Sequence, residues 1–280
     1  MSERMAIVYG GNRGIFDGIL ISLLSLTEKT SVPIDVYILT MTLTDRDARF
    51  VPIDEEQRAF LEGVCRRSNA DSRVYIKDVG KLYREHLMDS PNAVSDYTPY
   101  ALIRLLLCKL DGLPEKLLYL DADTVINRDL TELWETDVSE VEFAAALDHY
   151  GRIFMGYHYV NSGVMLLNMR KIRETRLFER CIDRLNRRRI FLPDQTALNR
   201  LVKKKKLLPR KYNEQKHFYE DTVIQHFTKT IIWHPFFPFF YTRNITPWQV
   251  GDVRSTLTHK YDALLDRYLA LKGEFENDKK

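Results

Sequence analysis

The segment from Leu117 to Val125 constrains the fold of this chain more than any other. Its apolar run 117–120 follows the turn-forming residues 111–114, a pattern typical of a strand buried in a parallel sheet. The run leads directly into Asp121-Ala122-Asp123. In open α/β sheets, ligands bind beyond the carboxyl ends of the strands. A ligand site is therefore expected at these two carboxylates, although a solvated turn after a strand would look the same.

Strand-like and helix-like patterns alternate through the first half of the chain, which predicts an α/β fold with a mostly parallel sheet between helices. Asp54 and Gln57 form a capping-box pattern at the start of one helix. The segment 80–95 is expected to be irregular, and 233–248 to be a packed aromatic loop. The expected strands are 5–9, 34–39, 73–77, 117–120, 143–147, 159–168 and 222–226. The expected helices are 18–26, 54–67, 97–109, 169–188, 195–202 and 255–271.

The length of 280 residues suits one large α/β domain or two small ones. Because no low-complexity linker divides the chain, we expect a catalytic domain over 1–250 and a C-terminal helical extension over 251–280. The net charge of +3 argues against a dedicated nucleic-acid binder. Cys65, Cys108 and Cys181 are widely spaced in helix-like segments, which indicates buried free thiols in a reducing compartment.

The N-terminal residues lead directly into a strand-like run, without the features of a signal peptide, and no apolar stretch has the length of a membrane span. We therefore expect a cytoplasmic location. Two basic clusters, 187–189 and 203–206, have two interpretations. The simpler one, which we favour, is a solvated helix face. The other is peripheral contact with an anionic membrane at its inner face.

Several further polar segments are candidates for a site. Carboxylates such as Asp121 and Asp123 are hard oxygen ligands for Mg²⁺ or Mn²⁺, and such an ion can carry a diphosphate. His226 follows a short apolar strand, and imidazole suits Mn²⁺, although a lone histidine is more often only exposed or packed. Lys229 is close enough along the chain to meet a phosphate.

Three other candidates have equally ordinary alternatives. The loop Gly10-Gly11-Asn12 ends the first strand but has neither the dinucleotide-binding nor the P-loop spacing, so it resembles a simple turn. Asn161-Ser162-Gly163 interrupts an apolar strand, which marks either a site or a bulge. Asp194 precedes Gln195 at the start of a helix, where it is either a cap or a site residue.

In this order, the motifs resemble those of the retaining glycosyltransferases of family eight, which include glycogenin and bacterial lipooligosaccharide galactosyl- and glucosyltransferases. The resemblance covers 5–248. It is most specific in 117–123 with 129–134, in 161–168, and in Asp194-Gln195. It implies the GT-A fold, a mostly parallel mixed sheet flanked by helices that binds a nucleotide sugar.

The resemblance also implies roles for single residues. It places Asp121, Asp123 and His226 around Mn²⁺, or Mg²⁺, against the diphosphate of UDP. It matches Arg104 to the donor-binding arginine of the family. Residues implied to contact the nucleotide and diphosphate are Tyr9, Gly10, Gly11, Asn12, Ala122, Ser162 and Lys229. Residues implied to line the donor sugar are Asp148, Asn161, Asp194 and Gln195.

The implied reaction moves galactose or glucose from a UDP-sugar to a hydroxyl of a glycan or glycolipid, with retention. Double displacement and front-face attack both remain open, as do the donor sugar, acceptor and oligomeric state. Family members often have Asp or Asn in the first loop, where this chain has Gly10-Gly11. Their Lys-Pro-Trp segment corresponds to Thr246-Pro247-Trp248, so Lys229 is the candidate for the missing lysine.

Two other classes of protein would share part of this pattern. A sugar-phosphate nucleotidyltransferase should have a longer glycine-rich loop with a basic residue after the first strand. A catalytically silent sugar-nucleotide-binding protein of the same fold should have lost part of its metal trio, whereas Asp121, Asp123 and His226 are all present.

Overall fold

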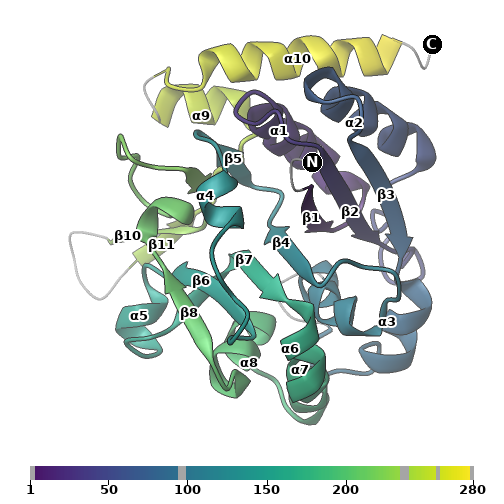
Figure 1. Ribbon diagram of the computed structural model, residues 1–280, viewed down its shortest axis with the longest axis vertical. Coiled ribbons are helices and arrows are strands. Elements are labelled where there is room, and N and C mark those ends of the chain that lie inside the picture. Colours follow the sequence, from purple (N-terminus) through teal and green to yellow (C-terminus); the bar gives the residue numbers. More distant parts are fainter. Residues whose placement is uncertain (1–3, 94–98, 234–239, 257–258, 278–280) are drawn as a thin grey trace.

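A seven-stranded mixed sheet forms the centre of the molecule, in the order β3-β2-β1-β4-β7-β6-β8 (Figure 1). The structure is a computed structural model that describes residues 4–93, 99–233, 240–256 and 259–277. The strands of this sheet are β1 (Met5–Gly10), β2 (Ile34–Thr40), β3 (Arg73–Asp78), β4 (Lys116–Leu120), β6 (Phe143–Leu147), β7 (Val160–Asn168) and β8 (Lys205–Leu208).

Strands β1 to β4 are parallel, with Ile7 of β1 opposite Val36 of β2 on one side and Leu118 of β4 on the other. Strand β7 runs antiparallel to both β4 and β6, and β6 is parallel to β8. The prediction of a mostly parallel mixed sheet is therefore confirmed. The β6–β7 pairing shifts register after Ala145, opposite the segment that contains Asn161-Ser162-Gly163, so this polar interruption is indeed a bulge.

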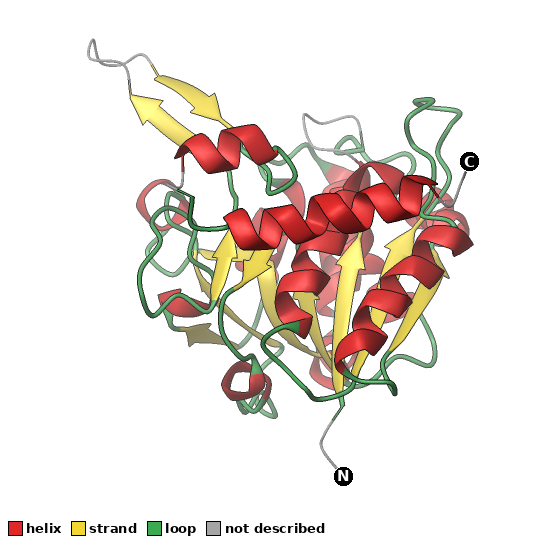
Figure 2. Cartoon of the chain, turned by 90° about the horizontal axis from the view of Figure 1, so that it is seen from above, coloured by secondary structure: helices red, strands yellow, loops and turns green. Residues whose placement is uncertain are grey.

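Helices cover both faces of the sheet (Figures 1 and 2). Helices α1 (Phe16–Thr27) and α2 (Glu55–Ser68) pack together, and α10 (Asp262–Asn277) lies across α1. The ring centroids of Phe275 and Phe16 lie 5.1 Å apart, so α10 packs against α1 through these two side chains. The second group is η2 (Pro99–Lys109), α6 (Met169–Thr175), α7 (Leu177–Arg187) and α8 (Pro193–Leu201).

Shorter elements connect the layers and complete the chain. The helical ones are η1 (Arg13–Ile15), α3 (Gly80–His86), α4 (Thr131–Trp134), α5 (Gly151–Phe154), η3 (Arg210–Tyr212) and α9 (Val250–Thr256). Two antiparallel pairs stand outside the main sheet, β5 (Thr124–Ile126) with β9 (Ile224–His226) and β10 (Thr230–Trp233) with β11 (Phe240–Arg243). Figure 2 shows the β10–β11 hairpin projecting from the body.

Four expectations about elements were wrong. Segment 80–95 contains α3, whose first amide is capped by the carboxylate of Asp78. The expected helix 169–188 is divided at Arg176, which has a left-handed backbone (φ 54°) that lets the apolar face of α7 turn inward. The expected helix 255–271 begins only at Asp262, after α9. The aromatic segment 233–248 contains β11 and the last residue of β10, while 234–239 lies outside the described residues.

The three cysteines are free thiols, as predicted, with Cys65 and Cys181 buried and Cys108 partly buried. The capping box of Asp54 and Gln57 is present at the start of α2.

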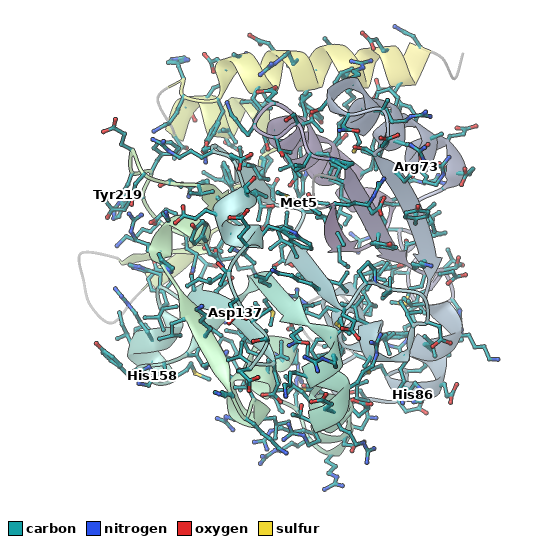
Figure 3. All side chains as sticks on the ribbon, in the orientation of Figure 1. Met5, Arg73, His86, Asp137, His158 and Tyr219 are labelled. Atoms are coloured by element: carbon teal, nitrogen blue, oxygen red, sulfur yellow. The ribbon has the colours of Figure 1, made fainter. Side chains whose placement is uncertain are left out.

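Among the described residues, no helix combines the length and apolarity needed to cross a membrane. Figure 3 shows the side chains on this frame, with Met5 at the start of strand β1.

Candidate active site

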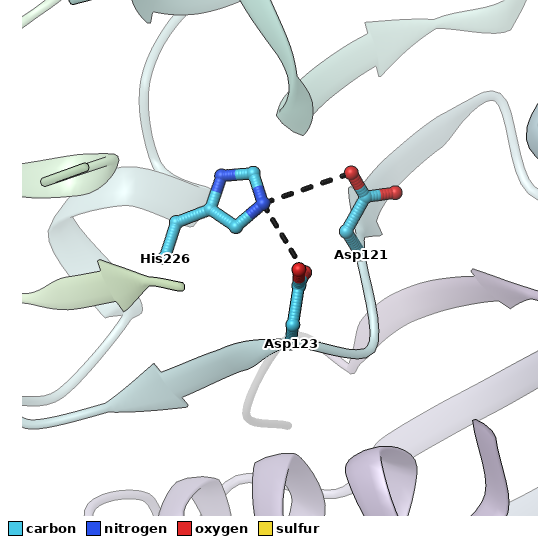
Figure 4. Close-up of side chains that lie close together, drawn as sticks. All are labelled: Asp121, Asp123 and His226. Atoms are coloured by element: carbon cyan, nitrogen blue, oxygen red, sulfur yellow. Dashed lines mark ion pairs between the residues drawn. The ribbon is translucent and has the colours of Figure 1, made fainter. Parts of the chain in front are cut away.

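The small β5–β9 pair brings together residues that are far apart in the sequence. Strand β5 follows Asp123 directly, and its Thr124 lies opposite His226 of β9. The amide of Phe227 donates to the carbonyl oxygen of Asp123 (2.9 Å), which fixes the register at this point. As a result, the imidazole of His226 faces the carboxylates of Asp121 and Asp123 (Figure 4).

This trio has the composition and spacing of a divalent cation site. The Nε2 atom of His226 lies 3.2 Å from Asp123 Oδ1 and 3.8 Å from Asp121 Oδ2. One ligand atom from each residue falls within 4.8 Å of the others. Two carboxylates and one imidazole are a donor set that suits Mn²⁺. Among the described residues, this is the group that meets the geometric requirement for a metal ion.

Gly163 of β7 provides the space for this arrangement. A Cβ atom at Gly163 would lie 2.1 Å from His226 Cε1 and 2.7 Å from Asp121 Oδ2. Any other residue would therefore push the histidine and the carboxylate apart. The glycine of the Asn-Ser-Gly interruption is explained by this close approach, and the residues present fit a bound cation.

The charges of the trio affect its protonation. Burial alone would lower the pKa of His226, but the carboxylates of Asp123 and Asp121 outweigh burial and raise it. A protonated imidazole has no lone pair for a metal. The histidine must therefore lose a proton when it becomes a ligand.

Arg104 of η2 connects the trio to the opposite wall of the site. Its guanidinium donates to Asp121 Oδ1 (Nη2, 2.9 Å) and lies 3.2 Å from Asp194 Oδ2 (Nε). It also donates to the carbonyl oxygen of Ser162 and stacks 4.2 Å over the ring of Tyr119. Only 6% of Arg104 is exposed, so its charge is held in a fixed position between buried Asp194 and partly buried Asp121.

Asp194 and Gln195 occupy the first turn of α8 and are both buried. Burial raises the pKa of Asp194, and the charge of Arg104 opposes that rise. Gln195 is held at both ends, because its Oε1 accepts from the Ser162 amide (2.9 Å) and its Nε2 donates to Asp148 Oδ2 (3.1 Å). The two residues are therefore firmly oriented toward β7.

Asp148, at the end of β6, is fully engaged with protein donors. Its Oδ1 accepts from the amides of Tyr150 and Gly151 at the start of α5. Its Oδ2 accepts from Gln195 and from Asn161 Nδ2 (2.9 Å). Asp148 thus holds Asn161 and Gln195 in fixed orientations.

A cavity of about 320 Å³ lies between these groups. Most of the predicted site residues line it: Gly10, Gly11, Asn12, Arg104, Asp121, Ala122, Asp123, Ser162, Asp194 and Gln195. The other lining residues are Ile15, Tyr100, Ala101, Tyr119, Leu192 and Trp248. His226 and Asp148 stand behind this lining, joined to it by an ion pair with Asp123 and a hydrogen bond from Gln195, and Asn161 is hydrogen-bonded to Asp148.

Two predicted residues lie elsewhere. The Tyr9 side chain is completely buried away from the cavity, and its hydroxyl pairs with that of Ser22 (2.8 Å). Its side chain is therefore not placed to contact a nucleotide, because β1 directs it into the core beside α1. Lys229 is exposed and is not among the residues that line the cavity.

The Thr-Pro-Trp segment returns to the site after the β10–β11 hairpin. Trp248 lines the cavity and lies against α1, where a Cβ atom on Gly18 would come within 2.5 Å of the indole. The hairpin therefore accounts for the long separation of Trp248 from His226. Thr246 carries no charge, and it hydrogen-bonds Gln249 instead.

Sequence reasoning missed Asn213, which contacts both His226 and Asn161. A single asparagine after a basic segment has no distinctive pattern in one sequence. The parallel bridge between Glu214 and Gln225, which are distant in sequence, brings it beside His226.

Comparison with known proteins identifies the family of this site. The model of glycosyl transferase family 8 matches residues 6–249. The chain belongs to glycosyl transferase family 8. An Escherichia coli lipopolysaccharide 1,2-glucosyltransferase is 34% identical over 205 residues. The match covers 58% of this family 8 chain and 60% of that relative. A Haemophilus influenzae protein named as a glycosyltransferase is 25% identical over 225 residues, 76% of this chain and 64% of its own. The chain thus spans somewhat less than two thirds of either relative.

Solved structures of glycosyltransferases share the fold. Galactosyltransferase LgtC, solved with donor and acceptor sugar analogues, has a TM-score of 0.66, with 19% identity and 96% of each chain covered. Glycosyltransferase GlyE of Streptococcus pneumoniae has a TM-score of 0.60 at 20% identity, covering 96% of this chain and 64% of that one. The GT-A fold predicted from the sequence is therefore confirmed.

Proposed function

We propose that this chain transfers galactose or glucose from a UDP-sugar to a hydroxyl of a glycan or glycolipid, with retention at the anomeric carbon and with Mn²⁺ as cation. The observation that carries the proposal is the trio of Asp121, Asp123 and His226 at the edge of the cavity, joined through Arg104 to Asp194 on α8. We further propose that residues 1–250 form the catalytic unit and that 251–280 cover it as a helical extension.

The cavity suggests how a UDP-sugar would be divided among its walls. Backbone at Gly10, Gly11 and Asn12 would meet the base and ribose, and Asp121, Asp123 and His226 would hold the cation. When bound, the cation would supply Lewis-acid stabilisation of the charge on the departing diphosphate. Arg104 adds a fixed positive charge to that stabilisation. Ala122 and Ser162 line the cavity between these groups, and exposed Lys229 is our candidate for a further diphosphate contact.

The contacts of Asp194 and Gln195 on α8 favour front-face attack over double displacement. Asp194 would have to leave its ion pair with Arg104 to act as a nucleophile, and Gln195 is held at both ends. In front-face attack, the acceptor oxygen bonds to the anomeric carbon as the bond to the phosphate oxygen breaks. The departing phosphate oxygen takes the hydroxyl proton. Asp148, Asn161 and Gln195 would then hold the donor sugar in position.

The proposal predicts Mn²⁺-dependent release of UDP from one hexose donor. UDP release would be measured across a panel of UDP-sugars with Mn²⁺, and with EDTA as the control. Calorimetry of UDP binding with and without Mn²⁺ would accompany it. We expect one hexose donor to exceed the others, and EDTA to reduce release to background. Failure of UDP to bind in the presence of Mn²⁺ would contradict the proposal.

For the basic cluster 187–189, the surrounding structure leads us to propose, in place of the solvated-face interpretation, contact with an anionic membrane that carries the acceptor. Arg187, Arg188 and Arg189 are exposed, and Phe191 beside them is 70% exposed. The next residue, Leu192, lines the cavity. Basic and aromatic side chains together are typical of membrane-surface segments. The other cluster, 203–206, has a simpler role, since it leads into the edge strand β8, where lysines discourage pairing with another chain.

This membrane contact can be tested with two matched double variants. Arg188→Gln/Arg189→Gln removes two charges, and each contributes about 1 kcal/mol near an anionic surface. Binding to anionic vesicles in a sedimentation assay should therefore weaken roughly thirtyfold. Lys203→Gln/Lys204→Gln removes the same charge at β8 and should change binding little. Equal binding of the unmodified chain to neutral and anionic vesicles would contradict the proposal.

A further inference from the structure

Asn213 lies between the candidate metal site and the sugar side of the cavity. It follows η3 and is only 2% exposed. Its Oδ1 lies 3.1 Å from His226 Nδ1, and its Nδ2 donates to Asn161 Oδ1 (3.0 Å). Asn213 is therefore the direct link between His226 and the bulged strand β7.

The hydrogen bonds along this link have a single consistent direction. The series of hydrogen bonds begins at the carboxylate of Asp148. Because a carboxylate only accepts hydrogen bonds, Asn161 must donate to it through Nδ2. The Oδ1 of Asn161 then faces Asn213 and also accepts from the Gly163 amide (2.9 Å). Asn213 must in turn present Nδ2 to Asn161, which leaves its Oδ1 for His226.

The last bond of the link determines the role of His226. Because Asn213 presents an oxygen, the Nδ1 atom of His226 must carry the proton. The Nε2 atom, which faces Asp121 and Asp123, is then the atom whose lone pair can bind a cation. In metal sites, such partners orient the ring and set its tautomer.

The backbone keeps Asn213 in place independently of any ligand. The Glu214 amide donates to the carbonyl oxygen of Ile224 (2.9 Å), and the His226 amide donates to that of Glu214 (2.8 Å). These bonds fasten the segment after η3 to β9. Asn213 is therefore positioned before a cation arrives.

We propose that Asn213 is a positioning residue that holds His226 ready for a divalent cation and couples that site to the sugar-side residues Asn161 and Asp148. The inference rests on the proposed function for the identity of the ligands. The positioning of His226 depends only on the contacts of Asn213, so this inference and the proposed function can fail separately.

Two substitutions separate the two hydrogen bonds of Asn213. Asn213→Ala removes both, and Mn²⁺ affinity should fall about 10–100-fold, as expected for loss of such a partner. Asn213→Asp keeps an oxygen for His226 but replaces the donor to Asn161 by a second acceptor. This variant should keep Mn²⁺ affinity within a few fold of the original and should lose UDP-sugar turnover. Free Mn²⁺ would be measured by electron paramagnetic resonance during titration of the protein without nucleotide.

Two controls distinguish positioning from general destabilisation. Asn168 is a buried asparagine at the other end of β7, where it caps α6, so Asn168→Ala should leave Mn²⁺ affinity unchanged. In a His226→Ala background, Asn213→Ala should cost no further Mn²⁺ affinity, because Asn213 acts through the histidine. Additive losses in the double variant would indicate a merely structural role.

The outcomes are decisive for each proposal. Unchanged Mn²⁺ affinity in Asn213→Ala, or no Mn²⁺ binding by the original chain, would overturn the inference. A fall in Mn²⁺ affinity without turnover of any UDP-sugar by the original chain would support the role of Asn213 and contradict the proposed function.

Discussion

Replacing Asp123 by Asn is expected to reduce UDP-sugar transfer by at least about a hundredfold, because the cation that would stabilise the departing diphosphate loses a charged ligand. The substitution keeps the shape of the side chain, and Asp123 is partly exposed, so the fold should be unchanged. Transfer would be measured with Mn²⁺ at saturating donor. Circular dichroism and thermal unfolding would verify the fold.

A second readout of Asp123→Asn does not depend on catalysis. Asp123 is the strongest of the interactions that raise the pKa of His226, whereas burial lowers it. In the metal-free variant, burial should dominate, and the pKa of His226 should fall. This change can be followed by nuclear magnetic resonance during a pH titration. The exposed carboxylate Glu140, changed in Glu140→Gln, is the control. Full transfer activity in Asp123→Asn would refute the metal assignment.

Replacing Arg104 by Met is expected to lower the free energy of unfolding by about 3–5 kcal/mol, because it leaves buried charges without their partner. The charges are those of Asp194, which is buried, and Asp121, which is partly buried. Urea denaturation at pH 7 would measure the loss. Arg58 also pairs with two carboxylates, Glu55 and Glu62, but near the surface, so Arg58→Met should cost no more than about 1 kcal/mol per pair.

The pH dependence of Arg104→Met has a definite sign. Without the guanidinium, the pKa of Asp194 should rise further above its unfolded value, because burial already raises it. The folded variant then binds more protons than the unfolded chain, so its stability should improve as the pH falls below the raised pKa. Adding Asp194→Asn to Arg104→Met should recover part of the loss at pH 7. A loss below about 1 kcal/mol in Arg104→Met would show that Arg104 does not neutralise these carboxylates.

Local patterns predicted the elements that carry the site, because those patterns depend on neighbouring residues. The apolar run before Asp121 is β4, and the capping box at Asp54 opens α2. The same rules failed at Arg176, where packing of α7 imposes a left-handed backbone that basic helical composition does not predict. They also failed for β10 and β11, because aromatic residues suit either strands or packed loops.

The amino-acid sequence alone identified the chemical groups of this protein: two carboxylates, a histidine and an arginine in an order that resembles family eight. It could not place them, because the contacts that unite them join distant segments. The pairing of β5 with β9 brings His226 to Asp123, and Gly163 of β7, which has no side chain, leaves the space for His226 and Asp121. Asn213 has no local pattern at all, since its role comes from a bridge between Glu214 and Gln225. Long-range pairing of this kind is decided by the packed core of the whole chain.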